Sequence, residues 1–477
     1  MPRRHIVCRS FRVVVIGLLL AAMTAPAFAQ GRPPRGGGDA GTGPKAPWEV
    51  GSYDPAWADA RTRTTAGIQY DKRQTDEQNG DRLYTAIGAL QPGTTFKIGP
   101  GTWSIARKTS INLVGTAAAP IRIVAADDKN PPVITRPDDK QNVLNLGDGG
   151  GQATCEYLQL HGLRLTGGSS LIRLYACQQV WIDGCELDHP GAEAITANVQ
   201  DTSYLHITRN HIHHMESAAN TCEGMYLGAN NSKARMTFSV IALNHVHDCR
   251  GTQGDGIEVK QGSHHNWIVE NEIHDCNYPC ITVYGTDGLG INLIERNTCY
   301  NSGDNVVQVQ GEAIVRNNLM INGKAACFAS HDHQGKSRAL TVVHNTMINE
   351  ARGAKMSSWN DREGMVFANN AVYCKTGPAI EFNGGSSGVT FVGNVAAGNV
   401  IGTTGAGDTG GVFKLAASDD VLKDFADVKF DASARDAHPN KRGSNVIGRA
   451  DREHVCEFDL AGTERKRRPI AGAFDVK

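Results

Sequence analysis

This sequence has almost no net charge, and it has no long apolar run after residue 29. Among 477 residues, 48 are Lys or Arg and 49 are Asp or Glu, which gives a formal net charge of −1. Because no basic excess is available to attract phosphates, a nucleic-acid partner is disfavoured. After residue 29, no run reaches the roughly 18 apolar residues that a membrane-spanning helix requires. We therefore expect neither nucleic acid nor a membrane as a partner.

Residues 1–29 have the three parts of a secretory signal peptide. Basic residues come first, at Arg3, Arg4, Arg9 and Arg12. Residues 13–22 form an apolar segment too short to cross a bilayer, and Ala27-Phe28-Ala29 is a small-residue cleavage site. No cysteine lies at the cleavage point, so we expect no lipid anchor there. The pattern predicts a secreted or periplasmic protein, with residues 30–79 forming a Gly/Pro-rich linker and an N-terminal extension.

A short unit of β-forming residues recurs along the chain. In its clearest copy, the run Gly254–Gly262 (GDGIEVKQG) precedes a strand that ends at Asn271. Equivalent asparagines recur at intervals of roughly 20 to 34 residues, the repeat signature of a solenoid. They are Asn210, Asn244, Asn271, Asn297, Asn317, Asn345, Asn370 and Asn394. We interpret this column as structural, because stacked asparagines hydrogen-bond along the row.

The order of these segments predicts an all-β solenoid with a short helix at its start. Leu83, Ile87 and Leu90 share one face of a helix over residues 81–90, which Pro92-Gly93 ends. Such a helix closes the apolar end of a repeat array. We expect the β-helix with its N-terminal cap over residues 80–399, and C-terminal coils or a cap over residues 400–477.

Several motifs resemble those of secreted right-handed parallel β-helix proteins. They are the turn Gly99-Pro-Gly101-Thr-Trp103, the entry Ala119-Pro-Ile121-Arg-Ile, the N-x-[IV]-H-[DH] coils and the closing G-x-x-R…G-A-F-D that ends at Asp475. The resemblance covers roughly residues 80–477 and implies that fold. Since lyases, epimerases, hydrolases and adhesins share it, the fold alone does not identify the activity.

Alternation along each strand places two columns of side chains on one outward face. The column through Glu258 reads Arg173, Thr196, Tyr226, Glu258, Thr282, Gln308, Ala329, Ser357 and Glu381. The column through Lys260 reads Tyr175, Asn198, Gly228, Lys260, Tyr284, Gln310, His331, Trp359 and Asn383. Aromatic rings pack on sugar faces and amides bond hydroxyls, so this face predicts a groove for a linear polysaccharide. The expected substrate-binding residues are Arg173, Tyr175, Asn198, Tyr226, Gln308, Gln310, His331 and Trp359.

Two further rows carry potential metal ligands. Glu193, Glu223 and Asp255 stack just before the strands of three successive coils and are candidates to hold Ca²⁺, which prefers oxygen ligands. They are alternatively turn caps that accept local backbone N–H groups. His213, His247 and His274 form a row with a spacing of about 4.8 Å, so we expect stacked imidazoles rather than convergent metal ligands.

The combination of a lysine with acidic neighbours is similar in outline to calcium-dependent pectate lyases that use one lysine base. That resemblance implies β-elimination on an acidic polysaccharide, with Lys260 as the base beside Glu258. Alternatively, Lys260 holds the substrate carboxylate while Tyr284 or Tyr226 takes the proton. An epimerase would use the same groups. A glycoside hydrolase would use Asp255 with Glu258, and a non-catalytic polysaccharide-binding or surface structural protein needs no such chemistry. We expect a monomer.

Eleven of the twelve cysteines remain after the signal peptide is removed. Cys249 and Cys276 occupy the same position in adjacent repeats, at a spacing that a disulfide accepts. They form either that bridge or a row of buried thiols.

Overall fold

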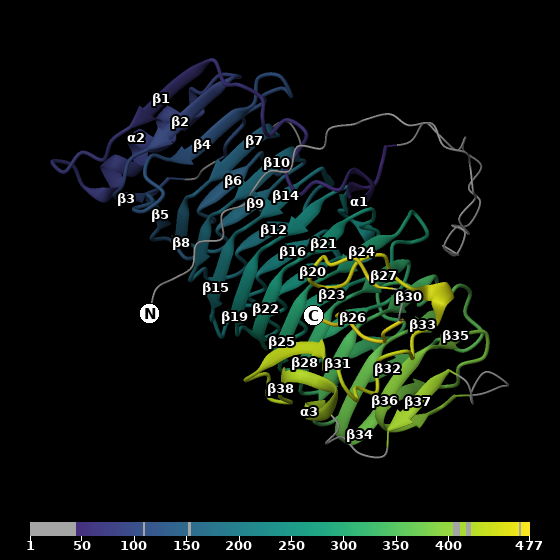
Figure 1. Cartoon of the computed structure of the whole chain (residues 1–477). Helices are drawn as coiled ribbons and strands as arrows, with labels where there is room; N and C mark the ends of the chain where they lie inside the picture. The colour runs from purple at the N-terminus through teal and green to yellow at the C-terminus, as the bar shows by residue number, and fades with distance from the viewer. Residues whose placement is uncertain (1–43, 108–109, 151–153, 404–410, 416–420, 467–468) are drawn as a thin grey trace, which may run out of the picture.

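The computed structural model describes residues 44–107, 110–150, 154–403, 411–415, 421–466 and 469–477. These residues form a long parallel β-helix with a helical cap at one end and a C-terminal segment along one side (Figure 1). The predicted signal peptide and the first part of the linker lie outside the described residues. No helix among the described residues is long and apolar enough to cross a membrane.

Each coil contributes strands to three parallel ladders. The first ladder runs in the order β1 (Thr64–Ile68), β2 (Thr94–Ile98), β4 (Ile121–Ala125), β7 (Glu156–His161), β10 (Gln178–Asp183), β14 (His206–Thr208), β18 (Val240–Ala242), β21 (Trp267–Val269), β24 (Asn292–Glu295), β27 (Ala313–Arg316), β30 (Leu340–Val343), β33 (Val366–Ala368) and β35 (Thr390–Val392). The short strands β13 (Thr202–Ser203) and β17 (Met236–Thr237) pair at its side.

The second ladder follows the first around each coil. Its strands are β3 (Thr102–Ser104), β5 (Val133–Arg136), β8 (Arg164–Gly167), β11 (Glu186–Asp188), β15 (His211–Met215), β19 (His245–Cys249), β22 (Glu272–Cys276), β25 (Thr298–Ser302), β28 (Leu319–Gly323), β31 (Thr346–Asn349), β34 (Ala371–Asn383), β36 (Asn394–Ile401) and β37 (Val412–Leu415).

The third ladder completes the coil and carries the predicted functional columns. It consists of β6 (Leu144–Leu146), β9 (Ile172–Leu174), β12 (Ile195–Ala197), β16 (Met225–Leu227), β20 (Ile257–Val259), β23 (Ile281–Val283), β26 (Val307–Val309), β29 (Phe328–Ser330) and β32 (Ala354–Ser357), and it ends on the long strand β34. The predicted all-β parallel solenoid is confirmed.

Along each strand, every second side chain points into the coil, and these inward side chains form its core. Ile257 and Val259 of β20 are fully buried, and their partners Ile281 and Val283 stack directly on them. One continuous apolar cluster joins such positions from Leu83 to Ala396. A buried side chain of this kind contributes about 1.5–3 kcal/mol, so the core stabilises every coil against its neighbours.

The asparagine ladder lies between the first and second ladders and differs from prediction at one position. Asn271 Nδ2 donates to Asn297 Oδ1 at 3.0 Å and to the carbonyl of Ile241 at 2.9 Å. The ladder then passes through Asn318, which accepts from Asn297 Nδ2 at 3.0 Å. The prediction of Asn317 was wrong by one residue. Asn317 has a φ of 55° and donates instead to the carbonyl of Phe458.

The N-terminal cap is a helix, α2 (Asp76–Gly88), that starts at a Thr75/Gln78 capping box. Leu83 and Ile87 are buried against the first coils, as predicted. Ahead of the cap, β1 pairs with β2, and the arm containing α1 (Pro47–Val50) lies along the first ladder. In this arm, Trp48 stacks on His265 at 6.4 Å between ring centroids.

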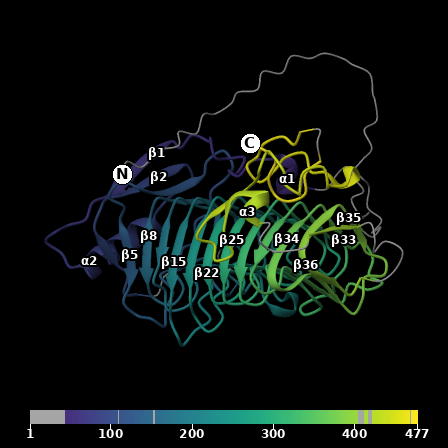
Figure 2. The same ribbon diagram turned by 60° about the horizontal axis from the view of Figure 1, so that its bottom comes forward.

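The C-terminal segment folds back over the solenoid. It contains α3 (Val421–Asp424), β38 (Phe425–Val428), β39 (Arg435–Pro439) and the 3-10 turn η3 (Arg452–His454). Figure 2 shows it lying over the coils around β25 and β34. Phe425 packs on Tyr373, whose hydroxyl donates to Asp424 at 2.6 Å. The outer face of the second ladder is therefore covered from Tyr300 onward.

All eleven cysteines from Cys155 to Cys456 are free and buried. Cys249 and Cys276 are partners in the register of β19 and β22. Of the two alternatives for this pair, the structure has the row of buried thiols.

Candidate functional site

The strand register reproduces the predicted Glu258 column except at one coil. Arg173, Thr196, Tyr226, Glu258, Thr282, Gln308, Ala329, Lys355 and Glu381 are paired in succession. Ala329 pairs with Lys355, whereas Ser357 was predicted there. The register therefore differs from the prediction by two residues at this coil.

The same shift makes Trp359 a core residue. Its side chain is 0% exposed, and its Nε1 donates to Ser330 Oγ at 2.9 Å. The ring also contacts Phe382, with 6.0 Å between the centroids. The prediction that Trp359 lines an outward groove was therefore wrong. Gln310 is fully buried as well.

Lys260 lies at the centre of a buried cluster on the third ladder. Its Nζ forms an ion pair with Glu258 Oε1 and lies 4.5 Å from the ring centroid of Tyr226 and 4.9 Å from that of Tyr284. Lys260 is only 4% exposed, and Glu258 only 2%. The sequence predicted an outward pair separated by roughly 6.7 Å along the strand. The side chains instead fold toward each other, because two buried charges must pair.

Three carboxylates meet beside this lysine. One oxygen from each of Glu223, Asp255 and Glu258 lies within 4.8 Å of the others. Thr282 Oγ1 donates to Asp255 Oδ1, and Thr221 Oγ1 donates to Glu223 Oε2, both at 2.6 Å. This arrangement of oxygens could hold a metal ion.

The acidic set differs from the predicted one in a single member. Glu193 lies outside the group of three and accepts from Ser170 Oγ at 2.7 Å. Glu258 takes its place, because it extends from the strand next to Asp255.

Burial controls the protonation of these acids. The pKa of Glu223 is raised to about 7, mainly by burial and to a smaller extent by the nearby carboxylates of Glu258 and Glu193. Burial, followed by the charge of Glu258, raises the pKa of Asp255 well above its usual range. The pKa of Tyr284 is also raised, first by burial and then by Glu258 and Asp255. The cluster therefore holds protons that exposed carboxylates would have lost.

Several buried polar atoms around the cluster have no hydrogen-bond partner. Among the described residues, they include Glu223 Oε1, Thr196 Oγ1 and both amide atoms of Gln310. Buried polar atoms are usually satisfied, so a concentration of unsatisfied ones indicates a place for a ligand, an ion or water.

A segment three coils further along the third ladder lies against Tyr284 and Gly285, next to the cluster. The Gly285 N–H donates to the carbonyl of Gln334 at 3.1 Å, and the His333 ring lies 5.6 Å from that of Tyr284. Gly335 has a φ of +110°, and a Cβ there would lie only 2.9 Å from Gly285 Cα. Since only glycine permits this approach, the contact of this segment with Gly285 depends on it.

The other predicted substrate-binding residues lie on the same side of the molecule. Arg173 belongs to β9 and Gln308 to β26, and the remaining three immediately follow strands of the third ladder. All are partly exposed: Arg173, Tyr175, Asn198, Gln308 and His331. Their roles stay predictions.

The predicted histidine row on the second ladder is a ring stack. His247 stacks on His213 at 5.4 Å and on His274 at 4.9 Å, with interplanar angles of 9° and 1°. Sequence reasoning missed the adjacent column of His211 and His245, although the repeated H-x-H spacing marks it. Burial and the neighbouring imidazole of His247 lower the pKa of His211 and bring that of His245 to about 4. These rings are therefore neutral at pH 7.

A cavity of about 430 Å³ lies away from both clusters, between the N-terminal arm and the C-terminal segment. Trp48, Tyr53, Trp267, Arg296, Arg316 and Phe458 are among the residues that line it. No sequence pattern predicted it, because it is built from segments far apart in the chain.

Comparison with known proteins agrees with this architecture. Residues 148–289 and 239–371 match a family model described as a right handed beta helix region. No curated protein matches the sequence. The solved structures that resemble it include the alginate lyase from Paenibacillus sp. str. FPU-7, with 16% identity and a TM-score of 0.47, covering 71% of this chain and 99% of that one.

Two further structures show the range of relatives. Pectate lyase Pel9A is 13% identical with a TM-score of 0.45, covering 88% of this chain and 98% of that one. The periplasmic alginate epimerase AlgG is 10% identical with a TM-score of 0.39, covering 70% and 83%. Structural similarity at such low identities and TM-scores does not indicate the activity of this chain. The strand ladders, together with the family match, show that the chain folds as a right-handed parallel β-helix.

Proposed function

We propose that this protein acts on a uronic-acid-containing polysaccharide by proton abstraction at C5, as a lyase or as a related epimerase. The observation that carries the proposal is the Lys260 amine, which lies between two tyrosine rings and beside three carboxylates on the third ladder. Aromatic and amide side chains flank this cluster along the same face, as binding of a sugar chain requires.

In β-elimination, a base removes the C5 proton, electrons form the C4–C5 double bond and the C4–O bond breaks. The uronate carboxylate must be neutralised for the C5 proton to become acidic. Lys260 either removes the proton or holds that carboxylate. The raised pKa of Tyr284 keeps its phenol protonated, which suits proton donation to the leaving oxygen better than abstraction at C5.

We further propose that the acidic cluster binds Ca²⁺. Glu223 and Asp255 would hold the ion, with Glu258 shared between the ion and Lys260. The hard oxygen donors fit calcium, and the unpartnered Oε1 of Glu223 is a free ligand position. Bound calcium would supply positive charge that neutralises the substrate carboxylate.

Burial favours one alternative, a polysaccharide-binding protein without catalysis. Lys260 is only 4% exposed, which limits direct contact between its amine and a bound sugar. A glycoside hydrolase is less favoured. Its two carboxyl groups stand about 5–5.5 or 6.5–9.5 Å apart, whereas oxygens of Asp255 and Glu258 lie within 4.8 Å.

The predicted signal peptide belongs to the same proposal, because polymeric substrates lie outside the cytoplasm. Export to the periplasm or the medium would bring the protein to an acidic polysaccharide.

The deciding experiment follows the ultraviolet absorbance of unsaturated uronates. Purified protein is incubated with alginate, pectate and other uronate polymers, with and without calcium. We expect absorbance to rise with one polymer, to disappear in Lys260→Gln and to persist in Lys355→Ala, a lysine control on the same ladder. Melting curves must establish that each variant is folded.

Other results separate the remaining functions. A changed ratio of C5 epimers without absorbance identifies an epimerase, and new reducing ends without absorbance identify a hydrolase. Polymer binding without any product identifies a binding protein and contradicts the catalytic proposal.

A further inference from the structure

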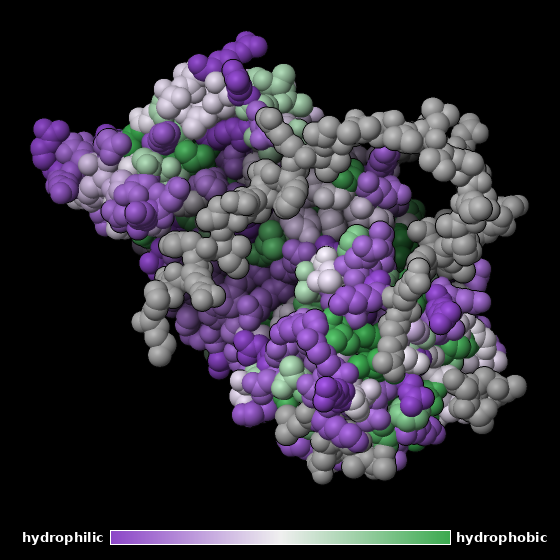
Figure 3. Space-filling view, viewed as in Figure 1, coloured by the Kyte–Doolittle hydropathy of each residue, from purple (hydrophilic) through white to green (hydrophobic). Residues whose placement is uncertain are grey.

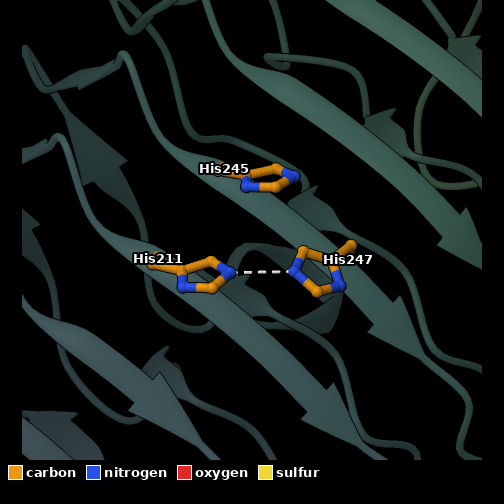
Figure 4. Close-up of side chains that lie close together, drawn as sticks. All are labelled: His211, His245 and His247. Atoms are coloured by element: carbon orange, nitrogen blue, oxygen red, sulfur yellow. Dashed lines mark hydrogen bonds between the residues drawn. The ribbon is translucent and has the colours of Figure 1, made fainter. Parts of the chain in front are cut away.

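The outer face of β15 and β19 brings three imidazoles together at a distance from the Lys260 cluster. His211 comes from β15, and His245 and His247 come from β19 (Figure 4). One ring nitrogen from each lies within 4.8 Å of the other two. This face belongs to the second ladder, in a region where Figure 3 shows a mostly hydrophilic surface over the middle coils.

His211 and His247 approach each other diagonally across two neighbouring strands, so a single column of histidines does not predict their contact. His211 pairs with His245 in the register, yet His211 Nε2 lies 2.8 Å from Nε2 of His247, two residues further along β19. Rings stacked in one column stay about 4.8 Å apart. A diagonal pair reaches across that spacing and can point two nitrogens at one site.

A carboxylate orients the ring of His247. Its Nδ1 lies 2.7 Å from Asp248 Oδ2, and Arg250 Nε donates to Asp248 Oδ1 at 2.8 Å. Asp248 has a φ of 56°, a conformation that aspartate tolerates, which turns its carboxylate back toward the ring. Proton donation from Nδ1 leaves the Nε2 lone pair of His247 as an acceptor directed at His211 Nε2. The same carboxylate–histidine arrangement supports metal-binding histidines in general.

The distance between the Nε2 atoms of His211 and His247 suits a small borderline metal ion. Zinc binds histidine nitrogen at about 2.0–2.1 Å in a tetrahedron, which places two ligand nitrogens about 3.3 Å apart. The Nε2 atoms of His211 and His247 therefore need to separate by only about half an ångström, within reach of a small ring rotation.

We propose that His211, His245 and His247 bind one divalent transition-metal ion of the zinc class. The ion joins two adjacent coils and keeps one coordination position open to solvent. Asp248 acts as a positioning residue through His247. A second possible set of His245, Glu272 and His274 shares His245, so the two sets cannot be filled at once.

The test uses metal-free protein without a polyhistidine tag, titrated with Co²⁺ and, separately, with Zn²⁺. We expect one equivalent of Co²⁺ to produce the visible absorption bands of a tetrahedral site, and Zn²⁺ to displace it. His211→Ala and His247→Ala should each abolish the bands. Asp248→Asn should weaken binding by about 10- to 100-fold, as loss of such an outer partner does.

His264→Ala is the matched control, because His264 is also a paired, partly buried histidine but lies outside this face. The His264→Ala variant should bind Co²⁺ as the unchanged protein does. Melting curves without metal check that each variant is folded, and Asp248→Asn keeps the test valid if a ligand variant fails to fold. The absence of cobalt bands in the unchanged protein, or bands that survive in His211→Ala, would overturn the assignment.

Discussion

The Lys260 cluster and the histidine face lie on neighbouring ladders of the same coils, yet they solve the problem of buried titratable groups in opposite ways. Around Lys260, acids and an amine are buried together, and one carboxylate forms an ion pair. On the histidine face, imidazoles stack on one another, and burial lowers the pKa of His213 and of His245 to about 4. A carboxylate pairs at the edge of this stack, where Asp248 contacts His247. The same burial raises the pKa of Glu223 and lowers that of His213.

Aperiodic segments lie beside both regions. Residues 331–335 lie against Tyr284 and Gly285 of the third ladder, beside the buried Lys260. On the second ladder, the C-terminal segment begins its cover at Tyr300, where Arg435 lies 4.1 Å from the ring centroid. The histidines lie on the open side of that boundary. A periodic scaffold thus acquires distinct sites where aperiodic segments cross it.

The largest expected effect comes from breaking the ion pair. Lys260→Met leaves Glu258 as an unpaired buried charge, and we expect unfolding in urea to require about 3–5 kcal/mol less free energy. Lys260→Met combined with Glu258→Gln should recover most of the loss. A double variant as unstable as the single one would contradict the pairing.

The second effect is a stability that falls as pH rises. Folding raises the pKa of Glu223 to about 7, so the folded state keeps a proton that the unfolded state releases above about pH 4.5. Stability should decline between roughly pH 4.5 and 7, by at most about 3 kcal/mol. Glu223→Gln should flatten this part of the curve in melts across pH. Added calcium should restore stability at pH 8 if the acids bind it.

The histidine face should show the opposite slope. Burial and the neighbouring imidazole of His211 lower the pKa of His213 to about 4, so the unfolded state takes up a proton first. Stability should fall as pH drops from roughly 6.5 to 4, by on the order of 2 kcal/mol. His213→Asn should remove that fall in chelator-treated protein while leaving the alkaline side unchanged. If His213→Asn changed stability equally in the acidic and the alkaline range, this would contradict independent titration of the histidine face and the Lys260 cluster.

The smallest effect concerns the boundary of the C-terminal cover. Arg435→Ala removes a partly exposed cation over Tyr300 and a 3.7 Å contact with Glu272. We expect a loss of only about 0.5–1 kcal/mol. Hydrogen exchange should increase in β38 and β39 but not in β20. Faster exchange at β20 would mean that the C-terminal cover and the Lys260 cluster are coupled.

The sequence predicted the elements that repeat and missed shifts caused by irregular connections. The inward positions of β20 and the cap residues Leu83 and Ile87 are where alternation and helical spacing predict them. Asn317 was misplaced by one residue and Trp359 by two, and no local signal in the sequence marks either slip. The register corrects both, through Asn318 in the ladder and Lys355 in the column.

By itself, the sequence determined the parallel β-helix, its core and its asparagine ladder, because each coil repeats the same short-range pattern against its neighbour. Only the tertiary structure decided the environment of the functional candidates. The segment beside the Lys260 cluster approaches Gly285 through Gly335, and the proposed metal ligands meet by a diagonal contact between strands. Such contacts join residues that no repeat relates, so periodicity carries no information about them.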